Sequence, residues 1–101
     1  NTCMSTPARP VLWTISADYF ATGEGRTFMA VIGYATSEEA AKKLFQDQFG
    51  DWFAQGCEAV AGVVQNPVTQ FLFSTEALQM LTKQNGNANI VVHASMHFNM
   101  S

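Results

Sequence analysis

Apolar and polar residues alternate in two regions, near the start of the chain and at its end. Residues 11–20, "VLWTISADYF", and residues 88–99, "ANIVVHASMHFN", both show this pattern. Because successive side chains of a strand point to opposite faces, both segments predict strands. Residues 27–34, "TFMAVIGY", are apolar at nearly every position. That composition predicts a strand covered on both faces. The loop between the first two strands, "ATGEGR", has two glycines that permit a tight reversal.

The helical period replaces this alternation after residue 35. Apolar side chains of residues 36–53 gather on one face of a helix, which predicts an amphipathic helix. Thr36 and Glu39 fit a capping box at its start, and either Gly50 or Gly56 could end it. This segment is the clearest helix in the sequence.

The region that follows contains two short β-like runs, residues 57–65 and 68–73. They flank Asn66-Pro67, a dipeptide that stops helices and starts turns, so we predict a hairpin. A helix over residues 68–82 is the alternative. Ser74 predicts the N-cap of a second helix that closes at Asn85-Gly86.

The predicted order of elements is ββαββαβ, which is the ferredoxin-like βαββαβ pattern with one strand added at the N-terminus. The fold class is α+β, with a mostly antiparallel sheet of about five strands and two helices on one face. We expect residues 1–9 to form a flexible N-terminal arm and residues 10–101 to form a single domain. The short loop between the first two strands conflicts with the ferredoxin-like strand order, so the strand order stays open.

The low fraction of charged residues and the net charge indicate which kind of partner the chain binds. Only 13% of residues are charged, while 48% are apolar and 12% aromatic. An average domain has about 25% charged residues, so self-association or binding to another protein is expected, with a low-charge monomer as the alternative. The net charge of −3 is scattered, whereas binding to a phosphate backbone needs clustered basic residues. Nucleic acid is therefore disfavoured as a partner.

The two cysteines, Cys3 and Cys57, cannot build a disulfide framework, and neither has metal-ligand spacing to another cysteine or histidine. We interpret them as unpaired thiols in a reducing compartment and expect a cytoplasmic protein. No run approaches the roughly 20 apolar residues of a membrane span, so no membrane partner is expected. No cofactor is indicated.

Polar side chains of the first and last strands would share one face of the sheet if both helices covered the other face. This predicted binding face comprises Thr14, Ser16, Asp18, His93, Ser95 and His97. Among the spare aromatic residues of the chain, Trp52 and Phe53 join the predicted binding set. A non-enzymatic interaction or assembly module is the function that these features favour.

The alternative is a small-ligand-binding protein or an enzyme in which His93 or His97 acts as a general acid or base oriented by Asp18. The two histidines are four strand positions apart, about 13 Å, so they cannot act on one atom or hold one metal ion. With only two histidines and a distant cysteine, a metal site is not expected.

Overall fold

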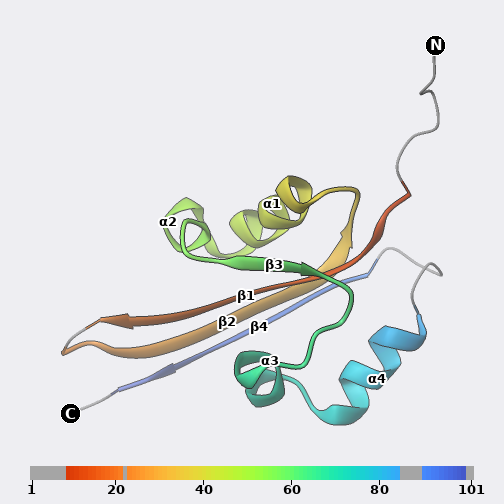
Figure 1. Cartoon of the computed structure of the whole chain (residues 1–101). Helices are drawn as coiled ribbons and strands as arrows, with labels where there is room; N and C mark the ends of the chain where they lie inside the picture. Colours follow the sequence, from red (N-terminus) through yellow and green to blue (C-terminus); the bar gives the residue numbers. More distant parts are fainter. Residues whose placement is uncertain (1–8, 22, 85–89, 100–101) are drawn as a thin grey trace.

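The computed structural model describes residues 9–21, 23–84 and 90–99. It is an α+β structure with a four-stranded antiparallel sheet and four helices (Figure 1). The elements are β1 (Val11–Ala21), β2 (Gly25–Ala35), α1 (Glu38–Phe49), α2 (Asp51–Ala54), β3 (Glu58–Ala61), α3 (Pro67–Leu72), α4 (Thr75–Lys83) and β4 (Val91–Phe98). The order of strands in the sheet is β3-β1-β2-β4. The predicted α+β class is confirmed, whereas the ferredoxin-like order and the fifth strand are not.

Strands β1 and β2 form a long hairpin whose register runs from Val11 opposite Ala35 to Ala21 opposite Gly25. The predicted reversal is confirmed, since Gly23 and Gly25 both have positive φ angles, 83° and 109°. Strand β3 pairs with the outer side of β1, and β4 pairs with the outer side of β2. Both later strands are therefore edges of the sheet.

Helices α1 and α2 cover one face of the hairpin (Figure 1). Phe45 and Ala41 of α1 are fully buried, and they share a hydrophobic cluster with Ile15 and Val31 of the two central strands. The N-cap of α1 is Ser37, whose side chain accepts a hydrogen bond from the backbone of the helix's first turn. The predicted N-cap, Thr36, is wrong. Ser37 has an extended backbone, and its hydroxyl accepts the hydrogen bond from the Ala40 amide.

Helices α3 and α4 cover the opposite face, so the prediction of two helices on a single face is wrong (Figure 1). Leu78 of α4 packs with Leu12 and Ile32, and Val68 of α3 packs with Phe28. The central strands carry apolar side chains on both faces, and each face needs its own helical layer. The two-sided pattern of residues 27–34 is thereby confirmed.

The predicted strand at residues 68–73 is wrong, because these residues belong to α3 and the segment that follows it. Asn66 is the N-cap, and its side chain accepts from the backbone of Thr69 at 2.9 Å. The Thr69 hydroxyl in turn accepts from the backbone of Asn66 at 2.8 Å. Pro67 occupies the first helical position, where its missing N–H costs nothing. The helical alternative is correct for residues 68–72, but the helix does not continue to residue 82, since Ser74 caps a separate helix, α4, as predicted.

Candidate functional site

The polar residues predicted to share one face lie on opposite faces of the sheet. Thr14 and Asp18 of β1 stand opposite Ile32 and Phe28 of β2, in the layer covered by α3 and α4. The histidines and the serine of β4 stand opposite residues 27, 29 and 31 of β2, in the layer of α1 and α2. The predicted binding face is therefore not a single surface.

Two of the predicted binding residues are buried and serve the fold. The Thr14 side chain donates a hydrogen bond to the carbonyl of Gly62 at 2.6 Å and accepts one from the amide of Val64 at 2.9 Å. The Ser16 hydroxyl accepts a hydrogen bond from the Asn66 side chain at 3.3 Å. Thr14 is 1% exposed and Ser16 is 9% exposed, so neither presents a hydroxyl to a partner.

Asp18 pairs with Arg26 across the hairpin, not with a histidine. The guanidinium donates two hydrogen bonds to the carboxylate, of 2.9 and 2.5 Å, and lies 4.8 Å from the centre of the Phe28 ring. The hydrogen bonds from Arg26 lower the pKa of Asp18 below its ordinary value. The orientation of a catalytic histidine by Asp18 is thus contradicted, because the carboxylate lies on the other face of the sheet from both histidines.

Substituting Asp18 with asparagine tests this pair. A carboxyl whose pKa is lowered in the folded state stabilises the protein above its unfolded pKa of about 4, and that contribution disappears as the pH falls through the folded value. Because both side chains are substantially exposed, we expect only a small loss of stability at pH 7. Urea unfolding of Asp18→Asn and wild type should show a difference that shrinks between pH 5 and pH 2. A difference that stays constant over this range would contradict the pairing.

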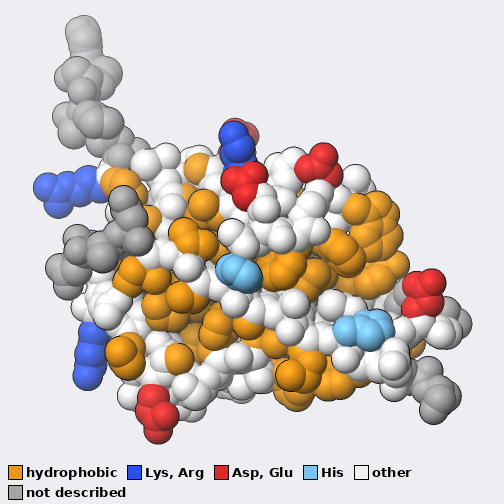
Figure 2. All heavy atoms as spheres, turned by 180° about the vertical axis from the view of Figure 1, so that it is seen from behind, with side chains coloured by type: hydrophobic (Ala, Val, Ile, Leu, Met, Phe, Trp, Pro, Cys, Tyr) orange, Lys and Arg blue, Asp and Glu red, His pale blue; other side chains and the backbone are white. Residues whose placement is uncertain are grey.

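The two histidines lie on the exposed edge strand β4. Nε2 of His97 lies 3.1 Å from Oδ1 of Asn99, and Nδ1 lies 2.8 Å from the Thr27 hydroxyl, so both ring nitrogens are within hydrogen-bond distance of a polar side chain. His93 makes an edge-to-face contact with the Phe49 ring, at 6.1 Å between centres. Ser95 lies between them and is exposed. Both histidines are visible on one side of the molecule in Figure 2, with apolar side chains between and below them.

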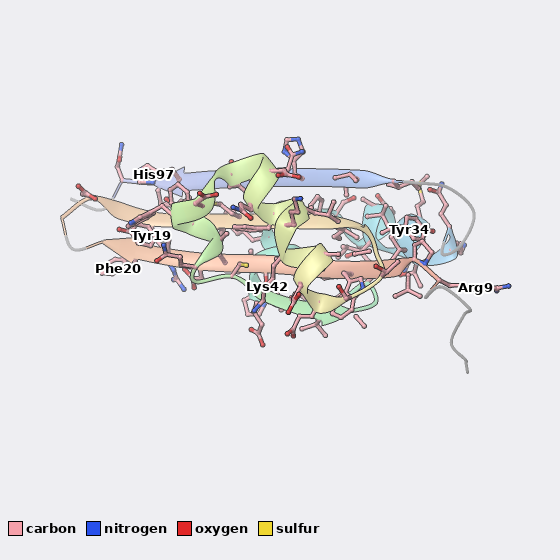
Figure 3. All side chains as sticks on the ribbon, turned by 90° about the horizontal axis from the view of Figure 1, so that it is seen from above. Arg9, Tyr19, Phe20, Tyr34, Lys42 and His97 are labelled. Atoms are coloured by element: carbon pink, nitrogen blue, oxygen red, sulfur yellow. The ribbon has the colours of Figure 1, made fainter. Side chains whose placement is uncertain are left out.

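The outer edge of β4 has no partner strand among the described residues (Figure 3). Its sequence, "VVHASMHF", contains no Asp, Glu, Lys, Arg, Pro or Gly. Natural sheets protect exposed edges with charges, prolines, bulges or very short strands. The opposite edge uses two of these devices, since β3 has four residues and begins with Glu58. Strand β4 is twice as long and uses neither.

An apolar groove runs beside β4 on the face of α4. Its volume is about 360 Å³. The lining residues are Phe73, Ala77, Met80, Leu81, Gln84, Ile90 and Val92. Met80 is 60% exposed, which leaves a flexible apolar side chain at the rim of the groove.

A cluster of three phenylalanines lies on the same face, at the other end of β4. Phe28, Phe71 and Phe98 contact one another edge to face, with ring centres 5.0 to 5.7 Å apart. Phe71 is 49% exposed, and Met96 of β4, which stands opposite Phe28, is 47% exposed. The alternation correctly indicates the face toward which Met96 points. Its exposure follows from the edge position of β4, which the sequence does not specify.

Trp52 and Phe53, the predicted aromatic binding residues, lie together on α2. They contact Tyr19 of β1 edge to face, at 4.7 Å for Trp52 and 5.8 Å for Phe53. Figure 3 shows Tyr19 on the face of α1 and α2. These rings line a pocket of about 230 Å³. In the sheet, β2 separates Tyr19 of β1 from β4, although Tyr19 and the histidines of β4 both lie on the face that α1 and α2 cover.

Cys57 is a buried free thiol that donates a hydrogen bond to the Ala54 carbonyl at 3.0 Å. Burial raises its pKa, which lowers its reactivity. Cys3 and the predicted arm, apart from Arg9, lie outside the described residues, as does the predicted closing turn at Asn85-Gly86. Among the described residues, no three His, Cys, Asp or Glu side chains are grouped to hold a metal ion. In the same part of the chain no helix is long and apolar enough to cross a membrane.

Comparisons with protein-family models, with curated proteins and with solved structures find no match to this chain. Function is therefore inferred from the chain's own side chains and from the edge that β4 presents.

Proposed function

We propose that this chain is a non-enzymatic assembly module that associates with a second copy of itself through the edge of β4. The observation that carries the proposal is the combination of an eight-residue uncharged edge strand with exposed apolar side chains around it. An unprotected edge pairs readily with another strand, since its outward N–H and C=O groups lack partners. Pairing would cover this edge and the apolar groove beside it.

The low charge of the chain supports the same conclusion. Monomeric proteins rarely leave large contiguous apolar patches in water, and such patches often mark interfaces. Here Met96 of β4 is 47% exposed and Met80 at the groove is 60% exposed, both on the face of α3 and α4, and Val91 is 47% exposed on the other face. A typical stable interface covers about 800 Å² on each partner, so the strand edge would need the adjoining groove as part of the contact. The enzymatic alternative has less support, because Asp18 lies away from both histidines.

The first test is the molar mass in solution, measured by light scattering on a sizing column over a hundredfold range of concentration. We expect a dimer at high concentration. Met80→Glu should raise the dissociation constant at least tenfold, because it places a charge in the groove that the partner covers.

Trp52→Glu is the matched control, since Trp52 is 57% exposed, close to the 60% of Met80, and the substitution also adds one negative charge. It changes the aromatic group that packs on Tyr19 of β1 and does not line the groove, so we expect association to be retained. A monomer at every concentration would overturn the proposed function. Loss of the dimer in Trp52→Glu alone would move the interface to α2.

A further inference from the structure

We infer that the two copies pair antiparallel along β4 with Ser95 on the two-fold axis, so that the sheet continues through eight strands. The inference rests on the proposed self-association and specifies its geometry. Strand β4 lies at the end of the sheet order, beyond β2, and its outer side is free of other described strands (Figure 3).

The two faces of the sheet restrict the register. A two-fold axis perpendicular to a sheet returns each face to itself, and directly opposed residues of antiparallel strands point to the same face. Each residue of β4 must therefore oppose a partner residue on its own face, and the axis must pass through a residue position. Within β4 the two central positions are Ala94 and Ser95.

Side-chain size favours the axis at Ser95. On the face of α3 and α4, this register places Val92 opposite the partner's Phe98 and Ala94 opposite the partner's Met96. A small residue then opposes a large one at each position, which fills space well. An axis at Ala94 would set two alanines against each other at the centre. On the other face, the Ser95 register pairs serine with serine and His93 with the partner's His97, so polar residues oppose polar residues.

The surface beside β4 is complementary to itself under the same symmetry. The apolar groove lies next to Ile90 and Val92, at the N-terminal half of the strand. The phenylalanine cluster, in which Phe71 is 49% exposed, includes Phe98 at the C-terminal half of the strand and lies on the same face. Antiparallel pairing brings the C-terminal half of one copy beside the N-terminal half of the other. Each groove would therefore receive the partner's aromatic end, and the contact would occur twice.

Disulfide cross-linking tests the register. Ser95→Cys is made in a Cys3→Ser background that keeps the buried Cys57, and the parent serves as the oxidation blank. Opposed residues of antiparallel strands have Cα atoms about 4.5 to 5.5 Å apart, which suits a disulfide. We expect Ser95→Cys to cross-link in most molecules at concentrations where the dimer forms. Val91→Cys should not cross-link, because the two copies of residue 91 would be about 26 Å apart, eight strand rises.

Ala94→Cys tests the alternative register, in which the two-fold axis passes through Ala94. More cross-linking in Ala94→Cys than in Ser95→Cys would overturn the axis at Ser95. Association without cross-linking at either position would overturn pairing about the centre of β4, while self-association itself would stand. A monomeric wild type would overturn both proposals.

A second variant gives an independent measurement. Ser95 is exposed, so Ser95→Lys should fold as wild type does, with the same circular dichroism spectrum. It would place two lysines against each other on the axis, and like charges directly opposed destabilise a strand pair. We expect at least a tenfold higher dissociation constant. Gln79→Lys is the control, since Gln79 is exposed on α4 but does not line the groove, and its dissociation constant should equal that of wild type. Equal affinities for both variants would contradict the inference.

Discussion

Replacing Thr14 with valine is expected to lower the free energy of unfolding by about 2 to 5 kcal/mol. Valine has nearly the shape of threonine but lacks the hydroxyl. In the folded protein that hydroxyl donates to the Gly62 carbonyl and accepts from the Val64 amide. Thr14 is 1% exposed, so water cannot readily replace its hydroxyl. Each buried backbone group that loses its partner costs roughly 1 to 3 kcal/mol.

Thr14→Ser is the control, because it keeps the hydroxyl and removes only a methyl group. We expect it to cost about 1 kcal/mol, the value for one buried carbon. Chemical denaturation of the two variants and wild type at pH 7 gives the comparison. A domain of this size is stable by about 5 to 15 kcal/mol, so a loss of this size should lower the denaturation midpoint clearly. Equal losses for valine and serine would show that the hydrogen bonds contribute nothing.

The environment of Thr14 also shows where sequence reasoning fails. Alternation correctly predicts that Thr14 and Ser16 point away from Ile15, and polar residues at alternate positions normally face solvent. Their burial depends on residues 62–66, which follow β3 and cover this part of β1. These residues lie about 50 positions after Thr14 and Ser16 in the sequence. No local pattern contains that long-range contact. The apolar residues on both faces of residues 27–34 were the available signal, since they indicate helices on both sides.

The segment at residues 68–73 was ambiguous for a different reason. Its composition suits a strand, but Asn66 and Pro67 supply an N-cap and a first helical residue immediately before it. Thr69 completes the capping box with its own hydroxyl, which binds the Asn66 amide. Local capping therefore outweighs the weak β preference of the side chains. An interpretation that treats Asn-Pro as a helix start predicts α3 correctly.

The edge of β4 and the groove beside it were only partly predictable from the sequence. The alternation of residues 88–99 correctly indicates a strand with His93, Ser95 and His97 on one face. That β4 is an edge strand depends on its pairing with β2, and strand order is a property of the assembled sheet. The groove beside it likewise depends on where α4 packs. The absence of charged residues in β4 is visible in the sequence, but it becomes informative only once the strand is known to be an edge.

Replacing Gly25 with alanine is expected to disturb the edge strand itself. Gly25 has a φ angle of 109°, and a Cβ added there would lie 1.9 Å from the Phe98 carbonyl oxygen and 3.0 Å from its carbon. Both are backbone atoms of β4, so no side-chain rotation can relieve the clash. We expect the variant to lose about 2 to 4 kcal/mol of stability, since strain at positive φ costs about 1 to 3 kcal/mol before the clash is counted.

Gly23→Ala separates strain from the clash. Gly23 also has a positive φ angle, 83°, but its added Cβ would meet nothing within 4 Å. It should therefore show the cost of strain alone, about 1 to 2 kcal/mol. Hydrogen exchange should be faster at residues 96–98 in Gly25→Ala than in Gly23→Ala, because only the first displaces the end of β4 from β2. Equal exchange in the two variants would mean that β4 accommodates the added carbon.

The same pair of variants connects the hairpin to association. If the partner's β4 and groove receive the Met96 and Phe98 end of the strand, its displacement should weaken the dimer even when the rest of the sheet stays folded. We expect a dissociation constant at least tenfold higher for Gly25→Ala than for Gly23→Ala, measured by light scattering under conditions where circular dichroism shows both variants folded. Equal affinities, together with faster exchange at residues 96–98, would show that this end of β4 lies outside the interface.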